Sequence, residues 1–515
     1  MTNQTQQTPV REEPYAEGWL VMLYLAGDNN LTEEMVATLQ DIGSEDTSSN
    51  DRIVAQLDPS AVGVFSSRYD FGDGRRGTML EDFRDLEFDG GESSTGNPAT
   101  LVDFVKWALR RYGTKRRLLL VLSGHGSGTT EDFLVKDDNP VDALSIPELC
   151  EALAAIVDVT KRPIDILGFD ACFMSMGEVA HALQGKVGVV IGAEGEEPAF
   201  GWPFRKVLEA KSRHRQLGRP LDAEALAALI VRCYVTHYAA FDETAGRSVD
   251  LAAVRVADLA EVTTRFQELC SALLAKDVDH DQVLLAHWFA QTYKYDQFVD
   301  LQDLCEQLAA RFPADGAVAA AARRVADAVQ ACLITGGCSG HAYQFSHGLS
   351  VYFPWAFASP AYDQMPFAKE TGWASFLELH LDKTRRAGRP GMRRLGSREE
   401  TACTTALNPA DDFQKTREQL RSMMAGSGEL EALESSQETF DLATTLCRRG
   451  VPAADLSREV TFLRPRPVRS PPKSRHTANS RHTANTRHTA NTRFTSDRER
   501  AFKNLPVSIG VKFDP

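Results

Sequence analysis

The sequence predicts an α/β protein in which a mostly parallel β-sheet lies between layers of helices. Three observations lead to this fold class. Short apolar runs of strand length alternate with helix-like segments from Trp19 to Gly195. Each run is apolar on both faces, which is typical of a parallel strand covered by helices on both sides. With 515 residues, 43% of them hydrophobic, the chain is long enough to bury a large core.

The first part of the chain repeats the order strand, helix. Alternating strands and helices are expected at 19–25, 32–42, 51–58, 101–113, 116–123, 144–156, 163–172, 175–185 and 187–195. Ser145 and Glu148 have the spacing of an N-terminal capping box, and Gly113 and Gly185 mark helix ends. Such an alternation predicts a parallel sheet with crossover helices.

Composition divides the chain further. A helical, alanine-rich stretch is expected from 221 to 328, and a late strand closes at Pro354. The expected segments are a disordered N-terminus at 1–17, a globular domain at 18–384, a linker at 385–410, a small helical segment at 411–463 and a basic, disordered tail at 464–515.

Composition also excludes several classes of protein. The N-terminus lacks the basic start and apolar core of a secretory signal, and no apolar run reaches the roughly 20 residues that span a bilayer. We therefore expect a cytoplasmic protein without a membrane partner. The net charge of −14 argues against a specific nucleic-acid partner. Nine scattered cysteines do not indicate a disulfide framework, and Cys332 and Cys338 lack the further ligands of a zinc site.

Parallel sheets place functional residues at the carboxyl ends of their strands. His125 follows one predicted strand within Gly-His-Gly, Cys172 follows another, and the acidic loop AEGEEPAFGW follows a third. A cysteine nucleophile needs a neighbour that lowers the pKa of its thiol, because the thiolate is the attacking species. His125 is the candidate for that role.

Each of these residues also has a structural explanation. A single cysteine after a strand is often a small buried apolar side chain, and a histidine between glycines is often a turn residue. Their joint placement at the ends of neighbouring strands favours a catalytic pair. From the residues alone, both interpretations stay open.

The order of motifs resembles that of the clostripain-like cysteine peptidases, which share the caspase-like fold with caspases, legumains and gingipains. The matching motifs are WLVMLYLAGDNNL, LLLVLSGHGSG, ILGFDACFMSMGEVA and AEGEEPAFGWPF, followed by SVDLAAV, FVDLQDL and GLSVYFPW. They extend over roughly 18–381, and the resemblance implies a caspase-like α/β/α sandwich. The signature that surrounds the caspase cysteine is absent.

The resemblance implies a role for each motif residue. Cys172 becomes the nucleophile and His125 the second member of a Cys-His dyad. The backbone N–H groups of Gly126 and Cys172 become the oxyanion hole, which stabilises the charge that develops on the attacked carbonyl. No cofactor is required for this chemistry.

The resemblance also implies cleavage after arginine or lysine, through acidic side chains in the substrate pocket. Asp170 matches one of them, and Trp202 belongs to the family's Gly-Trp pair. Where many relatives have an acidic residue before that pair, this chain has Phe200. The residues expected to assist Asp170 are Glu194, Glu196 and Glu197. The alternative for Asp170 is a carboxylate that caps a buried loop.

Relatives are commonly activated by self-cleavage between the histidine and cysteine motifs. In this chain the interval contains a predicted polar loop with Lys136 as the candidate processing site, and an uncut loop is the alternative. Some relatives respond to calcium, for which Asp137, Asp138 and Asp142 are candidate ligands. A solvated acidic surface is the alternative there.

The tail contains a six-residue repeat that begins with RHTANS. It places four arginines at equal spacing, namely Arg475, Arg481, Arg487 and Arg493. They are candidate cleavage sites for this protein or for an upstream activating protease. The alternatives are a tether for an acidic partner and a solvated repeat without a partner.

The leading hypothesis is a bacterial, cytoplasmic cysteine endopeptidase that acts on protein substrates and processes itself, with a role in stress or antiviral defence. The alternative is a catalytically silent scaffold or binding protein that keeps the fold. In that case Phe200 would mark a remodelled pocket.

Overall fold

The computed structural model describes most of the predicted globular domain and one short piece of the C-terminal extension. The described residues are 18–43, 51–60, 66–72, 78–82, 93–129, 134–240, 248–293, 297–340, 342–355, 357–359, 362–386 and 460–463. The predicted N-terminal segment at 1–17, the linker beyond Arg386, most of the segment at 411–463 and the tail with its four repeat arginines lie outside the described residues.

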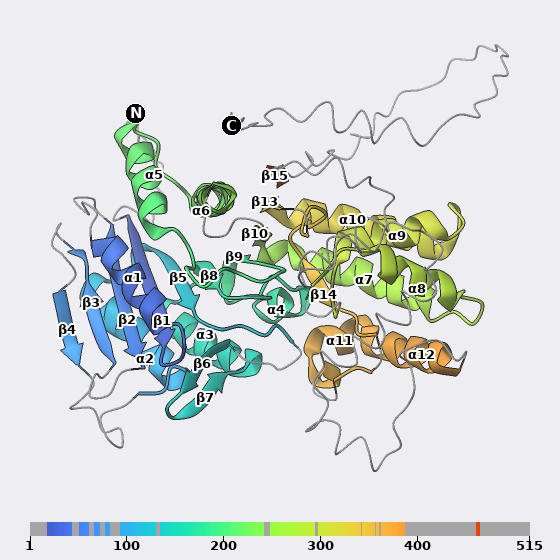
Figure 1. Ribbon diagram of the computed structural model, residues 1–515, viewed down its shortest axis with the longest axis horizontal. Helices are drawn as coiled ribbons and strands as arrows, with labels where there is room; N and C mark the ends of the chain where they lie inside the picture. Colours follow the sequence, from blue (N-terminus) through green and yellow to red (C-terminus); the bar gives the residue numbers. More distant parts are fainter. Residues whose placement is uncertain are drawn as a thin grey trace, which may run out of the picture.

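A ten-stranded sheet forms the centre of the molecule (Figure 1). In spatial order its strands are β15 (Val460–Leu463), β13 (Leu333–Ser339), β10 (Val249–Arg255), β9 (Val187–Gly192), β8 (Ile164–Asp170), β5 (Arg117–Ser123), β1 (Trp19–Gly27), β2 (Arg52–Pro59), β3 (Ser67–Asp70) and β4 (Thr78–Asp82). The strands from β9 to β2 are parallel, and those added at both edges are antiparallel. The predicted mostly parallel sheet is therefore confirmed at its centre.

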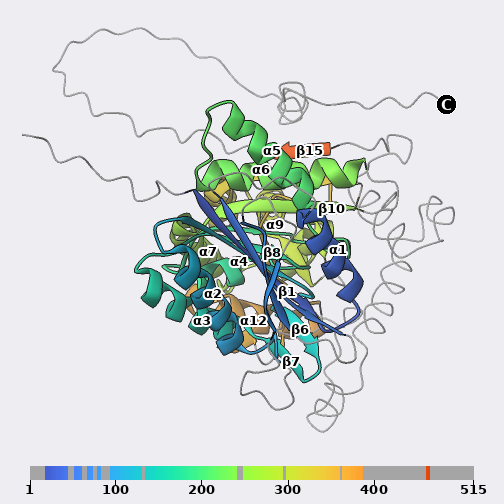
Figure 2. The ribbon, with the colours of Figure 1, turned by 90° about the vertical axis from the view of Figure 1, so that its left-hand side faces the viewer.

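Helices cover both faces of the sheet. One layer contains α1 (Thr32–Gly43), α5 (Phe204–Gln216) and α6 (Ala223–Ala239). The other layer contains α2 (Pro98–Tyr112), α3 (Ile146–Thr160), α4 (Gly177–Ala182), α7 (Leu259–Leu273), α8 (His280–Phe289), α9 (Leu301–Arg311), α10 (Ala317–Cys332), α11 (Pro366–Thr371) and α12 (Trp373–Arg386). Figure 2 shows α2 and α3 on one side of β1 and α1 on the other.

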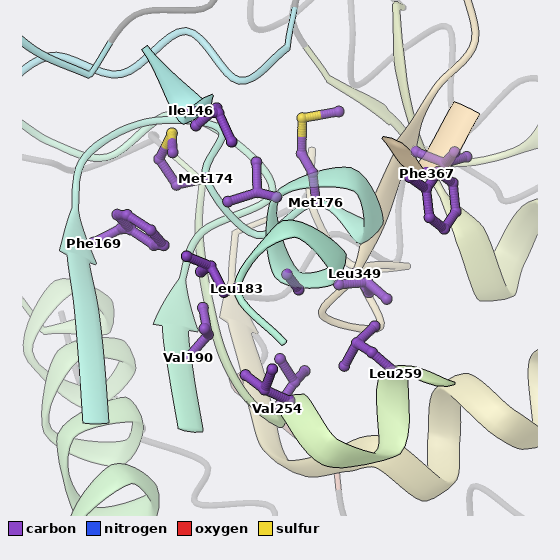
Figure 3. Close-up of a cluster of buried hydrophobic side chains, with 14 of the residues drawn as sticks. Ile146, Phe169, Met174, Met176, Leu183, Val190, Val254, Leu259, Leu349 and Phe367 are labelled. Carbon is purple, nitrogen blue, oxygen red and sulfur yellow. The ribbon is translucent and has the colours of Figure 1, made fainter. Parts of the chain in front are cut away.

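Two hydrophobic cores result from this layering. Alternate side chains of β1 enter different cores: Leu20, Met22 and Tyr24 on one face, and Val21, Leu23 and Leu25 on the other. All are buried, as expected for a central parallel strand. Part of the larger core is seen in Figure 3, where Phe169 of β8 and Val190 of β9 lie near Leu183, directly after α4.

The structure differs from the sequence prediction in three places. The polar loop predicted around Lys136 contains a hairpin of β6 (Leu134–Asp138) and β7 (Val141–Leu144). At the end of the segment 411–463, which was predicted to be small and helical, Val460–Leu463 form β15 on the edge of β13. A separate small sheet joins β11 (Thr292–Tyr293), β12 (Phe298–Asp300) and β14 (Ser350–Tyr352).

The predicted capping box of α3 is present, and it gives a test of local stability. The Glu148 N–H donates to Ser145 Oγ, and the Ser145 N–H donates to Glu148 Oε2 at 3.0 Å. Replacing Ser145 with alanine removes one of these bonds and should lower the free energy of unfolding by about 1 kcal/mol. Urea unfolding followed by circular dichroism measures the change. Ser271→Ala in α7 is the control, since that hydroxyl bonds within its helix, and it should stay within about 0.5 kcal/mol.

Candidate active site

The loops after β5 and β8 lie side by side. These strands pair in register with Ser123 opposite Asp170, and the Gly124 N–H donates to the Asp170 carbonyl at 3.1 Å. Gly126 packs so closely that a Cβ placed on it would lie 2.5 Å from the Cys172 carbonyl oxygen. A larger residue at 126 would push the two loops apart. The loops that carry His125 and Cys172 therefore converge, as predicted.

His125 is partly exposed, and both its backbone and its ring are held. Its carbonyl accepts from the Val135 N–H of β6 at 2.9 Å, and its ring Nε2 lies 2.8 Å from Asn30 Oδ1. Burial lowers the pKa of His125, and the Lys136 ammonium lowers it further. The resting ring is therefore neutral around pH 7.

Cys172 lies in a tight turn at the end of β8. Phe173, the next residue, has a φ of 62°, a conformation that few residues other than glycine adopt, and its N–H donates to the Gly195 carbonyl at 3.0 Å. The Glu197 N–H lies 3.3 Å from Cys172 Sγ. Burial raises the pKa of Cys172 to about 12, although the Glu197 N–H opposes the shift. The resting side chain is therefore a thiol.

His125 and Cys172 form a neutral pair in this state. No hydrogen bond joins the two side chains in the described part of the protein. The Gly126 and Cys172 N–H groups are not paired with a backbone oxygen of any described residue. Both stay available to a substrate carbonyl, as the oxyanion-hole prediction requires.

Behind Cys172, two carboxylates are buried without a cation among the described residues. Asp170 accepts from the Ser123 hydroxyl at 2.6 Å through Oδ2. The carboxyl oxygens of Glu197 and the indole N–H of Trp202 are buried beside it, and hydrogen bonding among Asp170, Glu197 and Trp202 opposes the rise in the pKa of both acids. Two buried acids without a countercharge are costly, so this group has the chemistry to bind a cationic side chain.

Burial raises the pKa of both acids. For Asp170 the pKa rises to about 6, although the Ser123 hydroxyl opposes the shift. For Glu197, burial and then the charge of Asp170 hold the pKa well above its usual range. Asp170 is therefore the first of the two to ionise as the pH rises.

Aromatic residues and two glycines pack around these buried acids. The Trp202 ring packs on Gly168, where a Cβ would lie 2.7 Å from the indole. Gly201 has a φ of 65°, and a Cβ there would lie 2.8 Å from Asp170 Oδ2. The Tyr238 hydroxyl fixes Gly201 by donating to its carbonyl. Phe200, directly before it, is 49% exposed and carries no charge.

Glu194, which the sequence suggested as a pocket residue, lies in a different buried network. Its Oε2 accepts from the Gly348 N–H at 2.6 Å, and its own N–H donates to Asp250 Oδ2 at 2.8 Å. Asp250 also accepts from the Gly195 N–H at 3.0 Å. These bonds fix the loop after β9, which presents Glu197 to Cys172 and Asp170.

The residues suggested for processing and for calcium lie in the β6–β7 hairpin. The Lys136 carbonyl accepts from Asn29 Nδ2 at 2.7 Å, and its ammonium lies 2.7 Å from Asp138. Asp137 is buried and accepts from the Thr95 N–H and hydroxyl. Asp142 accepts from the Ser94 hydroxyl at 2.6 Å. Cleavage after Lys136 would require these contacts to open.

A metal site is not evident in the same region. Within the described ranges, no group of three or more His, Cys, Asp or Glu side chains is arranged to hold a metal ion. The calcium expectation for Asp137, Asp138 and Asp142 stays a prediction. In the structure, oxygens of these three side chains contact protein groups.

Two site residues could not be selected from the sequence alone. Asn30 contacts the ring of His125 and follows β1 in the Gly-Asp-Asn-Asn turn, so the rule of strand ends also applies to it. Glu197 was one of three nearby glutamates. Only the path of the loop separates it from Glu194 and from the exposed Glu196.

Comparison with known proteins places this arrangement in context. A sequence model described as the clostripain family matches residues 23–379. No curated protein sequence matches the chain.

Among the described helices, none is long and apolar enough to cross a membrane.

Solved cysteine proteases share the fold. A secreted C11 cysteine protease from Bacteroides thetaiotaomicron, solved with an irreversible peptide inhibitor, covers 70% of this chain and 99% of its own at 16% identity and a TM-score of 0.52. The same organism's "iotapain" covers 69% and 99% at 15% identity and 0.54. An inactive zymogen C11 protease from Parabacteroides distasonis covers 68% and 97% at 19% identity and 0.50. At these identities the structures show a shared fold.

Proposed function

This chain belongs to the clostripain family of cysteine peptidases, and from that premise we propose that it is an endopeptidase that cleaves protein substrates after basic residues, arginine before lysine. Cys172 is the nucleophile and His125 its acid and base. The observation that carries the specificity is the buried pair Asp170 and Glu197 directly behind Cys172, with no described cation. Arginine is favoured because its planar guanidinium can bond two carboxylate oxygens at once.

The chemistry follows from the neutral pair. When a substrate binds, the thiol proton of Cys172 passes to His125, and the sulfur attacks the peptide carbonyl. The Gly126 and Cys172 N–H groups donate to the oxyanion. His125 then gives the proton to the leaving amine, and a thioester remains on Cys172. Water hydrolyses the thioester with His125 as the base, which releases the acid product and restores the thiol.

The arginine of the substrate also helps to position the scissile bond for attack by Cys172. Its positive charge pairs with Asp170 and lowers the cost of keeping both pocket carboxyls buried. Binding energy from a side chain that does not react is thereby used to hold the scissile bond against Cys172.

Several finer proposals rest on the sequence. Self-processing after Lys136, cleavage of the tail at Arg475, Arg481, Arg487 or Arg493, and activation by an upstream protease stay predictions. So do a cytoplasmic location and a role in bacterial defence. Of the three solved structures above, two are proteases described as secreted and one is described as an inactive zymogen.

The proposal is tested by the pH dependence of cleavage of peptides that differ only in the residue before the reporter. The peptides end in Arg, Lys, Asp or Leu. We expect Arg to give the highest kcat/KM and Asp the lowest. The kcat/KM for Arg should fall as the pH drops below about 6, because Asp170 becomes protonated there and its attraction for the guanidinium is lost.

The Leu peptide is the internal control for this titration. Both peptides depend on the Cys172–His125 pair, but only the Arg peptide depends on the charge of Asp170. The ratio of kcat/KM for Arg to that for Leu should therefore decline below about pH 6. A Leu preference would overturn the basic-residue assignment, and a ratio that is constant from pH 5 to 8 would overturn the role of the Asp170 charge in it.

A further inference from the structure

His125 has a polar neighbour that the Cys-His dyad does not include. Its ring Nε2 lies 2.8 Å from Oδ1 of Asn30, which follows β1 in a loop far from it in sequence. Building on the proposed function, we infer that Asn30 is a positioning residue that fixes the orientation and tautomer of His125. The working unit would then be Cys172, His125 and Asn30, supplied by the ends of three neighbouring parallel strands, β8, β5 and β1.

The loop that carries Asn30 is built to hold it still. The neighbouring Asn29 is buried, and its Nδ2 donates to the carbonyls of Ala26 at 3.1 Å and Lys136 at 2.7 Å. Asn29 Oδ1 accepts from the Leu31 N–H at 2.9 Å. Thr32 closes the turn by donating to the Gly27 carbonyl at 2.5 Å.

The same loop is tied to the hairpin that supports His125. The Asp138 N–H donates to the Asp28 carbonyl at 2.8 Å, and the Val135 N–H of the same strand donates to the His125 carbonyl at 2.9 Å. Strand β6 therefore holds the backbone of His125 and, through Asp28, the loop that carries Asn30. Asn30 itself is exposed, and its side-chain amide bonds the His125 ring. Because Asn30 is not buried, core packing does not explain this contact.

The chemical consequence concerns which ring nitrogen is free. With its oxygen facing the ring, Asn30 can only accept, so Nε2 carries the proton and Nδ1 presents its lone pair. That nitrogen can then take the thiol proton of Cys172. Once both nitrogens are protonated, the Asn30 oxygen accepts from a cation, which is a stronger hydrogen bond than from a neutral ring. The contact therefore becomes stronger as the reaction proceeds.

The charged groups around His125 make the effect measurable. From β6, Lys136 disfavours the protonated ring and Asp138 favours it. Asn30 adds an acceptor on the remaining side. Its loss should lower the pKa of the His125 ring further, and a carboxylate in its place should raise that pKa.

The experiment compares wild type with Asn30→Ala and Asn30→Asp in the full-length chain. We expect Asn30→Ala to lower kcat about 10- to 100-fold with KM changed less than about twofold, because the bond is strongest after proton transfer. The acid limb of the kcat/KM profile, which reports protonation of the His125 ring in the free enzyme, should move to lower pH. Asn30→Asp should keep most of kcat and move that limb upward by about one pH unit.

A second measurement does not depend on peptide cleavage. The rate at which iodoacetamide alkylates Cys172, followed by mass spectrometry across pH, reports the thiolate at this site. The two variants should shift this profile in opposite directions. Asn97→Ala is the control, since Asn97 caps α2 and has a structural role only; it should lower the unfolding midpoint and leave the profile unchanged.

The outcomes separate the two proposals. If wild type cleaves no Arg peptide, the proposed function fails whatever Asn30 does. If wild type cleaves it and both Asn30 variants keep the wild-type kcat and alkylation profile, the positioning role is wrong. A loss of kcat in both variants without opposite shifts of the profile would also overturn it, because it would indicate only a damaged loop.

Discussion

Replacing Cys172 with alanine is expected to lower kcat/KM for an Arg peptide more than about 10⁴-fold, to the background rate. The sulfur is the atom that bonds the substrate carbonyl, and no neighbouring group can supply a thioester in its place. The change removes one atom from a partly exposed side chain, so the fold should be kept. Circular dichroism and the unfolding midpoint would verify that the variant is folded.

A matched control comes from the chain itself. Cys233 in α6 is also partly exposed but lies away from the strand ends that form the site. Cys233→Ala should keep wild-type kcat/KM. An arginyl ketone that alkylates thiols should add the mass of one inhibitor group to wild type and to Cys233→Ala, and no mass to Cys172→Ala. Labelling of Cys172→Ala, or retained hydrolysis by it, would refute the nucleophile assignment.

The second large effect concerns Asp170. Replacing it with asparagine should lower kcat/KM for the Arg peptide at least about 30-fold, because removing one partner of a buried charged pair costs at least about 2 kcal/mol. The Ser123 hydroxyl can still bond the amide, so the loop is retained. The Leu peptide should change far less, since it makes no ion pair there.

Glu197 and Glu196 sharpen this test. Glu197→Gln should lower kcat/KM for Arg by a smaller factor of about 3 to 10, because burial and then the charge of Asp170 raise the pKa of Glu197 and favour its protonated form, which glutamine resembles. Glu196→Gln is the control, because Glu196 is exposed and should stay within about twofold of wild type. A larger loss for Glu196→Gln, or an unchanged Arg rate in Asp170→Asn, would place the specificity elsewhere.

Much of the fold was readable from local pattern. Continuous apolar runs predicted the central parallel strands, because a strand buried on both faces has no room for polar residues. Ser145 and Glu148 predicted the start of α3, since a capping box involves only residues three apart. The order of strands and the rule of strand ends were also enough to bring His125 and Cys172 together.

Other features depended on contacts between distant segments. The antiparallel strands β3, β4 and β13 at the sheet edges, and the β6–β7 hairpin, were not predicted. The hairpin contains Val135 with a φ of 49°, which sequence propensity does not favour, and it is stabilised by contacts with the Asn29 and Thr95 loops. Local pattern could not show that this polar segment folds against the site.

The sequence by itself determined the fold class, the family and the placement of His125 and Cys172 at the ends of neighbouring strands, because these follow from periodicity and from motifs in order along the chain. Only the tertiary structure decided which acid joins Asp170. Hydrogen bonds from the loop after β9 to Asp250 and Gly348 turn Glu194 away and bring Glu197 behind Cys172. It also decided that Asn30 meets His125. Both outcomes arise from packing between strands far apart in sequence, which no local pattern encodes.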